Sequence, residues 1–167
     1  MQDKLTQHDI TKIEEEIEYR KLVVRKEAIA EVKEMRAHGD LSENFEYHAA
    51  KKEKNKNEGR IKYLEKMVRN AIVVNAASKE GEVGLNKTVE LYFEEDEITE
   101  SYRLVTTVRG NSINGLISIE SPIGKAIMGH KLNDRILIKA SATYQYYVII
   151  KSIQDAITEE EDKIRSF

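Results

Sequence analysis

The chain contains no cysteine, a single proline and no apolar run that could cross a bilayer. Without cysteine it has no disulfide, no thiolate metal site and no cysteine nucleophile, which suits a reducing compartment. A membrane-spanning helix needs about 20 apolar residues, and the N-terminal residues also lack the apolar stretch of a signal peptide. The sequence therefore predicts a cytoplasmic protein without membrane contacts.

The motifs of most enzymes are missing as well. There is no glycine-rich phosphate loop and no nucleophile elbow. The four histidines lack the spacing of metal ligands, and each is more simply a surface or packing residue: His8, His38, His48 and His130. The sequence therefore gives no indication of an enzyme that acts alone.

The 167 residues suffice for one ordinary domain or two small ones, and their composition changes sharply near Val74. Residues 9–72 are rich in helix formers, and apolar residues recur there in two stripes at helical spacing. The first stripe is Ile10, Ile13, Ile17, Val24, Ala28, Val32 and Met35. The second stripe is Tyr47, Ala50, Lys54, Asn57, Ile61, Leu64 and Val68.

Turn and cap formers cluster between the two stripes, at residues 38–44. We therefore predict that residues 1–75 form an antiparallel coiled-coil hairpin with residues 38–44 at its tip. A first helix over residues 11–36 would be about 40 Å long at about 1.5 Å per residue. So long and thin an arm buries little core, and its length suggests reach.

After Asn75 the pattern alternates with a period of two. Short segments rich in β-branched and aromatic residues predict strands over residues 88–93, 102–105, 116–119, 135–139 and 146–150. Between them, Ser121, Pro122 and Gly129 have the positions of an N-cap, a first helical residue and a C-terminal stop. Residues 76–157 are therefore predicted to form a small α+β domain, with an antiparallel sheet and one short helix. An acidic tail follows at residues 158–167.

Residues 51–69 carry eight basic side chains against three glutamates, a local charge of +5. Such a segment could meet a polyanion. The simpler interpretation is a solvated helix face on which Glu58 pairs with Lys54 and Lys62, each four residues away. The sequence alone favours the simpler interpretation.

Asp40 and Glu43 are the most interesting polar pair. Three residues apart where a helix begins, their carboxylates can converge on one point, and Mg²⁺ takes hard oxygen ligands while keeping several waters. The same spacing is that of a capping box, in which Asp40 accepts from a backbone N–H and Glu43 reaches back. Two carboxylates cannot complete an octahedral site, so any metal here needs ligands from a second molecule.

Residues 38–51, which include both carboxylates, resemble the tip signature of the GreA/GreB family of bacterial transcript-cleavage factors. The similarity resumes in residues 58–65, 101–103 and 121–129, so it covers nearly the whole chain. Residues 48–50 and 58–60 look more like GreA than GreB. The resemblance implies an N-terminal coiled-coil arm and a C-terminal domain of FKBP-like fold.

The resemblance also implies a function in which the protein is not itself the enzyme. Family members bind bacterial RNA polymerase at its secondary channel, insert the arm and stimulate the polymerase's own hydrolysis of backtracked nascent RNA. By this resemblance Asp40 and Glu43 would hold a Mg²⁺ jointly with the polymerase, with none bound stably in isolation. Ser42, between them, would order the attacking water or the turn, unless it simply caps the helix.

Other roles follow from the same resemblance, and a monomer is expected. The residues expected to contact the 3′ segment of the backtracked RNA are Tyr47, Lys51, Lys52, Lys56 and Arg60. The residues expected to contact the polymerase are Glu120, Ser121, Pro122 and Ile123. Simpler alternatives are core packing for Tyr47 and helix capping in the segment around Ser121.

Two segments depart from the family pattern. Residues 5–9 lack the glycine of its N-terminal Met-Thr-x-x-Gly, and Ser141–Tyr144 replace a Gly-Gly hairpin, which implies a different turn. The tip keeps both carboxylates, so we favour a cleavage-stimulating factor. The alternative is a regulator that occupies the same channel without promoting cleavage. Peptidyl-prolyl isomerase activity is disfavoured, because the few aromatic residues of the C-terminal domain fall mostly within strands.

Overall fold

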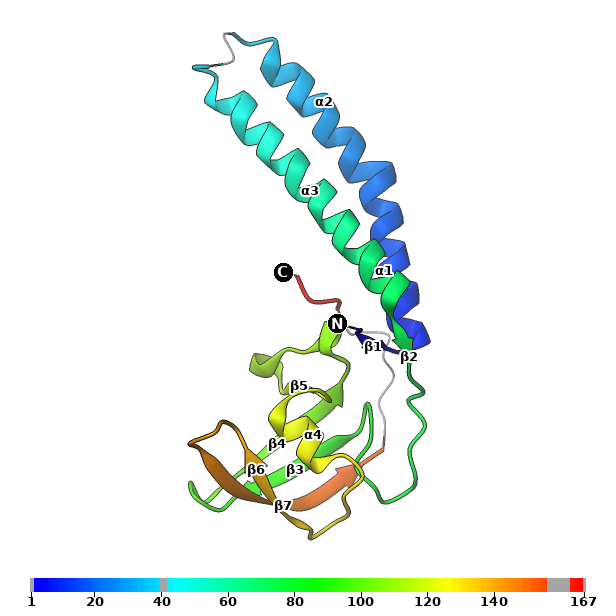
Figure 1. Ribbon diagram of the computed structural model, residues 1–167, viewed down its shortest axis with the longest axis vertical. Helices are drawn as coiled ribbons and strands as arrows, with labels where there is room; N and C mark the ends of the chain where they lie inside the picture. The colour runs from blue at the N-terminus through cyan, green and yellow to red at the C-terminus, as the bar shows by residue number, and fades with distance from the viewer. Residues whose placement is uncertain (1, 40–41, 156–162, 167) are drawn as a thin grey trace. The chain divides into compact units, whose positions relative to one another are not determined.

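The computed structural model describes residues 2–39, 42–155 and 163–166 (Figure 1). The structure divides into two compact units. The first comprises Ile10–Ala71 and the residues before Lys4, and the second comprises Lys4–Asp9 and all residues from Ile72 onward. The N-terminal segment thus belongs with the C-terminal domain, because strand β1 (Lys4–Leu5) pairs in parallel with strand β2 (Ile72–Val73).

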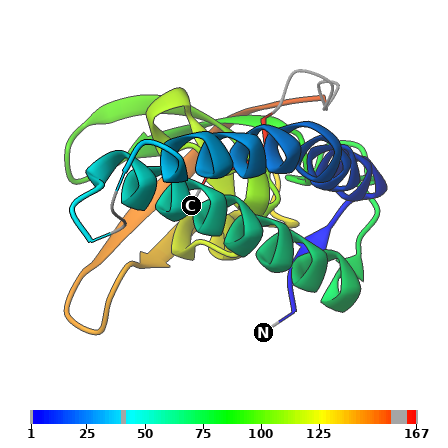
Figure 2. The ribbon, with the colours of Figure 1, turned by 90° about the horizontal axis from the view of Figure 1, so that it is seen from above.

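The first unit is the predicted antiparallel helical hairpin (Figures 1 and 2). One leg is a continuous helix made of α1 (Gln7–Tyr19), a π-helical turn (Arg20–Val24) and α2 (Arg25–Arg36); the other leg is α3 (Phe45–Asn70). The buried side chains of the hairpin follow the predicted stripes: Ile13, Ala50, Asn57, Ile61, Leu64 and Met67. At the end of the second stripe Met67 is buried in place of the predicted Val68, because a helix of 3.6 residues per turn drifts from a strict heptad.

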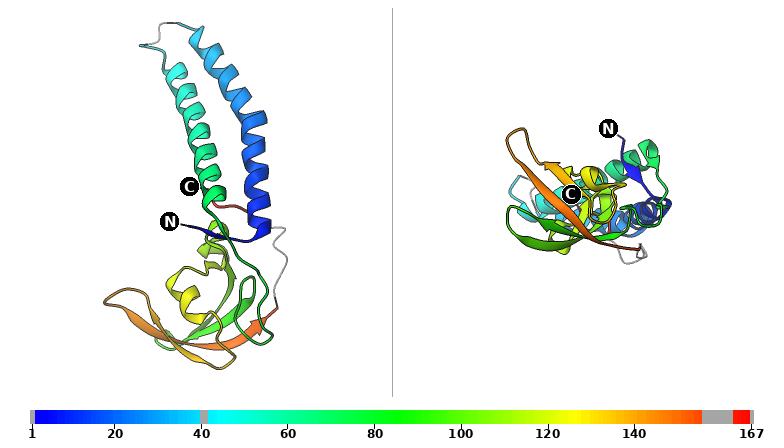
Figure 3. Two further views of the ribbon diagram at one scale, coloured as in Figure 1. Left: turned by 45° about the vertical axis from the view of Figure 1, so that its right-hand side comes forward. Right: turned by 90° about the horizontal axis from the view of Figure 1, so that it is seen from below.

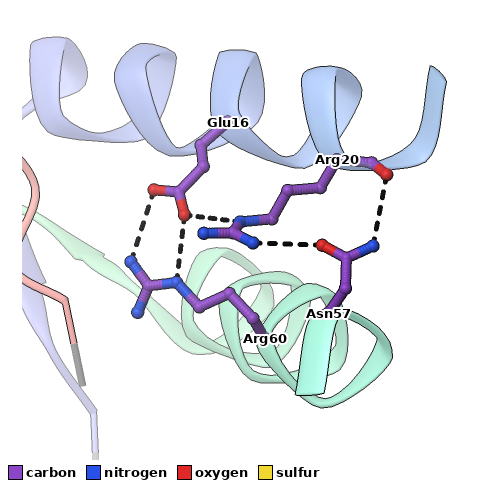
Figure 4. Close-up of polar contacts among 4 residues, drawn as sticks. All are labelled: Glu16, Arg20, Asn57 and Arg60. Carbon is purple, nitrogen blue, oxygen red and sulfur yellow. Dashed lines mark hydrogen bonds and ion pairs between the residues drawn. The ribbon is translucent and has the colours of Figure 1, made fainter. Parts of the chain in front are cut away.

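The π-helical turn explains why the first stripe is irregular between Ile17 and Val24. Figure 4 shows that Asn57 faces this turn from α3. Its Nδ2 donates to the carbonyl oxygen of Arg20 at 3.4 Å, and its Oδ1 accepts from Nη1 of Arg20 at 3.0 Å. A buried asparagine in a helical seam disfavours other registers, because a shifted pairing would leave the amide unsatisfied. Asn57 therefore fixes the alignment of the two legs.

Glu16 extends this network by joining both legs (Figure 4). Its Oε1 accepts from Nε of Arg20 at 2.8 Å and from Nε of Arg60 at 3.0 Å, while its Oε2 accepts from Nη2 of Arg60 at 3.3 Å. Burial alone would raise the pKa of Glu16, but the hydrogen bonds from Arg60 and Arg20 outweigh it, and the pKa is lowered. The ionised carboxylate therefore stabilises the hairpin.

Acidification is expected to loosen the hairpin through Glu16. Because its pKa is lower in the folded than in the unfolded chain, its contribution is complete above the unfolded value of about 4.3 and is lost as the pH falls through the lowered folded value. Thermal unfolding followed by circular dichroism should show Glu16→Gln less stable than wild type near neutral pH, with the two converging as the pH falls below the lowered pKa of the folded chain. Glu14→Gln, at an exposed position on the same helix, is the control. A gap that persists in acid would contradict this assignment.

The second unit contains a curled five-stranded sheet in the order β5-β4-β3-β7-β6, with helix α4 on its concave face (Figures 1 and 3). The elements are β3 (Thr88–Phe93), β4 (Ile98–Val105), β5 (Leu116–Ser118), α4 (Pro122–Ile127), β6 (Arg135–Lys139) and β7 (Gln145–Gln154). The buried core between sheet and helix is Val83, Val89, Leu91, Leu104, Ile127, Ile136, Ile138, Val148 and Ile150. This is the α+β architecture expected from the sequence.

One pairing differs from the antiparallel sheet that the sequence predicted. β4 and β5 run parallel, whereas the other three pairings are antiparallel. The reason is the connection between them, which contains the 3₁₀ turns Thr107–Arg109 and Ser112–Asn114 and crosses over instead of forming a tight hairpin. Between β6 and β7, the hydroxyl of Ser141 accepts from the N–H groups of Thr143 and Tyr144, which is the different turn expected there.

Parts of the chain lie outside the described residues, among them Asp40 and most of the predicted acidic tail, residues 158–162 and 167. Of the tail, Arg165 donates its backbone N–H to the carbonyl oxygen of Val108 at 2.7 Å. Within the described ranges, no helix is both long and apolar enough to cross a membrane.

Candidate functional site

The tip of the hairpin is held by Asn44, the N-cap of α3. Its Oδ1 accepts from the N–H of Tyr47 at 3.0 Å, which satisfies one of the free N–H groups at the start of α3. Its Nδ2 donates to the carbonyl oxygen of Met35, in the last turn of α2, at 2.6 Å. A single side chain therefore caps one helix and ties it to the end of the other.

This geometry corrects the capping alternatives for the tip. Asn44, and not Ser42, is the N-cap of α3, so Glu43 does not stand at the third helical position that a capping box requires. Glu43 immediately precedes the cap, is exposed, and makes no hydrogen bond or ion pair with another described residue. Asp40 lies outside the described residues. The carboxylate of Glu43 therefore has no structural role within the part of the hairpin that the structure describes.

The donor set at the tip fits a cation that is shared with another molecule. Among the described residues, no group of three or more histidine, aspartate or glutamate side chains could hold a metal ion. The exposed Glu43 offers hard carboxylate oxygens, and the sequence places Asp40 three residues before it. Oxygen ligands in small number, completed by waters or by another molecule, suit Mg²⁺.

Two of the three glutamates in the basic stretch of α3 pair with the opposite leg of the hairpin. Oε1 of Glu58 accepts from Nε of Arg25 at 2.7 Å and its Oε2 accepts from Nη2 at 2.9 Å, while Glu65 pairs with Lys21 at 2.5 Å. The hydrogen bond from Arg25 lowers the pKa of Glu58, and that from Lys21 lowers the pKa of Glu65. The predicted pairing of Glu58 within its own helix is therefore not its main interaction.

Three of the predicted RNA-contacting residues lie free on this stretch. They are Lys51, Lys52 and Lys56, which are exposed and have no carboxylate partner among the described residues. Tyr47 is half-buried at the start of the seam, and its ring meets that of the exposed His48 edge-on, with 5.4 Å between the ring centroids, so its contact with RNA stays a prediction. The prediction for Arg60 needs correction. Its side chain is only 11% exposed and is held by Glu16, so it joins the two helices and is not placed to bind RNA.

The predicted polymerase-contacting segment is a rigid turn at the start of α4. The hydroxyl of Ser121 accepts from the N–H of Gly124 at 3.0 Å and donates to the carbonyl oxygen of Ser118 at 2.6 Å, so the capping alternative for Ser121 is confirmed. A Cβ at Gly124 would lie 2.1 Å from that same carbonyl oxygen, so only glycine allows the turn to close. Pro122 is left exposed on this fixed backbone.

Glu120 and Ile123 flank the exposed proline in different ways. Glu120 pairs with Lys4 at 2.9 Å and with Lys125 at 3.4 Å, and the hydrogen bond from Lys4 is the main cause that lowers its pKa. Ile123 is half-buried and packs against the core of the sheet. The segment therefore offers a partner a charged group and an apolar ring at fixed positions.

Two family profiles match the chain. One is described as "Transcription elongation factor, N-terminal" and covers residues 4–73; the other is described as "Transcription elongation factor, GreA/GreB, C-term" and covers residues 78–155. The chain belongs to the GreA/GreB family of transcription elongation factors. The family resemblance of residues 38–51 is thereby confirmed.

Individual relatives of this GreA/GreB factor agree. It is 39% identical to transcription elongation factor GreA of Bacillus subtilis, over 84% of this chain and 89% of that protein. It is 42% identical to GreA of Thermoanaerobacter pseudethanolicus, over 83% and 88%. Among solved structures, the transcription factor Gfh1 is 26% identical over 92% of this chain and 97% of that one, with a TM-score of 0.45.

Sequence reasoning missed two polar features of this GreA/GreB factor. Asn44 was detectable, since an asparagine directly before a helical stripe is a common N-cap. The ion pair of Asp9 with Arg109 was not detectable. Its two atoms lie 2.7 Å apart, and both side chains are fully buried. Asp9 stands where the family pattern has glycine, and nothing in the local sequence points to a partner so far along the chain.

Proposed function

We propose that this elongation factor stimulates the intrinsic cleavage of backtracked nascent RNA by RNA polymerase, acting from the tip of its helical hairpin. The observation that carries the proposal is the state of Glu43. Its carboxylate is exposed beside the capped start of α3, and Asn44 has taken the capping role that would otherwise have explained it. A charged group that no other described residue pairs with is available to a second molecule.

Asp40 and Glu43 are the residues that would hold a Mg²⁺ jointly with the polymerase. When bound, the ion would supply Lewis-acid stabilisation of the charge on attacking and leaving oxygens. This chain would contribute two carboxylates that lie three residues apart in the sequence, with Ser42 between them to order the turn or a water. Two ligands alone bind Mg²⁺ weakly, so the isolated protein is expected to hold none stably.

The remaining contacts divide between the two units. The exposed lysines of α3 would neutralise phosphates of the backtracked RNA: Lys51, Lys52 and Lys56. In the second unit, Glu120 and Pro122 would contact the polymerase from the rigid turn that Ser121 and Gly124 define. One tip per hairpin suffices for this action, and we propose that the factor works as a monomer in the cytoplasm.

The test is a stalled, backtracked elongation complex whose extruded RNA carries a label at its 3′ end. With Mg²⁺ present, addition of the wild-type protein should accelerate the release of short 3′ fragments. No acceleration, from a protein that still competes with a known channel-binding factor, would reject cleavage stimulation and favour the regulator that only occupies the channel. Fragment release by the protein without polymerase would instead show that it is itself a nuclease.

A further inference from the structure

Among the described residues of the hairpin, Phe45 has the most exposed large apolar side chain. It is the first residue of α3, and 84% of its surface is open to solvent. Its ring makes no contact with another aromatic ring among the described residues. An apolar ring gains nothing from such exposure in the free protein, because water contact is what burial normally removes. The exposed ring is therefore available to bind a partner.

The backbone that carries Phe45 is well fixed. It directly follows Asn44, whose side chain is bonded both to the N–H of Tyr47 and to the carbonyl oxygen of Met35. The ring is therefore mounted on a capped helix end that is tied to the opposite leg. A rigid aromatic side chain loses little conformational entropy when it binds, which is the property of a good contact residue.

Phe45 and Tyr47 face different ways. Two residues apart on a helix, their side chains point about 200° apart. Tyr47 starts the seam, is half-buried and contacts the ring of His48, whereas Phe45 lies on the outer face. Of Phe45 and Tyr47, Phe45 is thus the one whose side chain is largely open to solvent.

The outer face continues from Phe45 with residues at spacings of four, three and four, which are Ala49, Lys52 and Lys56. All are exposed, and neither lysine has a carboxylate partner among the described residues. An aromatic ring followed by a small residue and a line of cations is the arrangement by which proteins hold single-stranded nucleic acid, with stacking at one end and phosphate pairing along the strand.

We propose that Phe45 stacks on a base of the extruded RNA and, with Lys52 and Lys56 on the phosphates, sets which nucleotide is held at the tip; this rests on the cleavage function proposed above. Every base has a face that can stack, so the contact accepts any sequence but is stronger for purines. Phe45 then makes the aromatic contact with RNA that the family resemblance had suggested for Tyr47.

The first test measures cleavage in backtracked complexes that differ only in the extruded bases. Phe45→Leu keeps the apolar volume and removes the ring; Phe45→Trp keeps a ring. Phe45→Leu should lower the cleavage rate at subsaturating factor about tenfold, equivalent to about 1.4 kcal/mol of lost stacking, and more for extruded purines than for pyrimidines. Phe45→Trp should retain the wild-type rate. Tyr19→Leu, which removes a 58% exposed ring from the other leg, is the matched control.

The second test does not depend on cleavage. A 5-iodouridine at the extruded 3′ end is irradiated in the complex, and the crosslinked residue is identified by mass spectrometry. A crosslink at Phe45 that Phe45→Leu removes supports the proposal. A crosslink at Tyr47, or Phe45→Leu as active as wild type, overturns it while leaving the proposed function intact. If the wild-type protein stimulates no cleavage, the proposed function fails, and the crosslink decides the stacking contact separately.

Discussion

Replacing Glu43 with glutamine, or Asp40 with asparagine, is expected to abolish stimulated cleavage and leave polymerase binding nearly unchanged. Glutamine has the shape of glutamate without its charge, so it removes a metal ligand and little else. The loss should reach about 100-fold or more, since even an outer partner of a metal ligand typically contributes about 10–100-fold. The measurement is fragment release from the backtracked complex across a range of factor concentrations, which separates weaker binding from a slower step.

Glu46→Gln is the matched control for this prediction. Glu46 lies in the first turn of α3, is exposed, and its Oε2 lies 3.6 Å from Nδ1 of His38. It carries the same charge as Glu43 close to the same tip. If Glu46→Gln impairs cleavage as severely, the general negative charge of the tip matters and not a ligand. If single substitutions of Asp40 and Glu43 leave cleavage unchanged, the metal role is wrong.

The sequence predicted correctly those elements whose residues form a pattern over a short stretch of the chain. The stripe that runs through Ala50, Ile61 and Leu64 has the period of a helix, and it is buried as such. The short helix α4 begins with a Ser-Pro pair in which Ser121 makes the capping bond expected of it. In each case the residues that decide the structure lie within a few positions of one another.

The features that escaped prediction depend on residues far apart in the sequence. The π-helical turn is matched by Asn57, which lies 37 positions after Arg20. Arg60 seemed a candidate for RNA because it stands in a basic run, but its partner Glu16 is 44 positions away on the other leg. Only the folded hairpin shows which cations of α3 are already paired. The parallel pairing of β5 escaped for the same reason, since it depends on the path of a whole connection.

The largest change in stability that we expect in the second unit comes from breaking the pair of Asp9 and Arg109. Asp9 sits in the N-terminal segment Lys4–Asp9, where its Oδ2 accepts from the N–H of Thr6 at 2.9 Å and from the hydroxyl of Thr106 at 2.7 Å. The hydroxyl of Thr6 in turn accepts from the N–H of Asp9 at 3.2 Å, which forms a capping box. Arg109 Nη1 donates to Oδ1 of Asn86 at 2.8 Å.

Asp9→Ala should therefore lower the free energy of unfolding by about 3–5 kcal/mol, because it leaves a fully buried guanidinium without its counter-charge. Urea denaturation followed by tyrosine fluorescence measures the change.

The double variant Asp9→Ala/Arg109→Met removes both charges and should recover much of the loss, since buried ion pairs are often replaceable by apolar side chains. Glu94→Gln breaks an exposed carboxylate–arginine pair, with Arg135, and should change stability little. If the double variant is as unstable as Asp9→Ala, the capping box and packing of Asp9, and not its charge, hold the N-terminal segment in place.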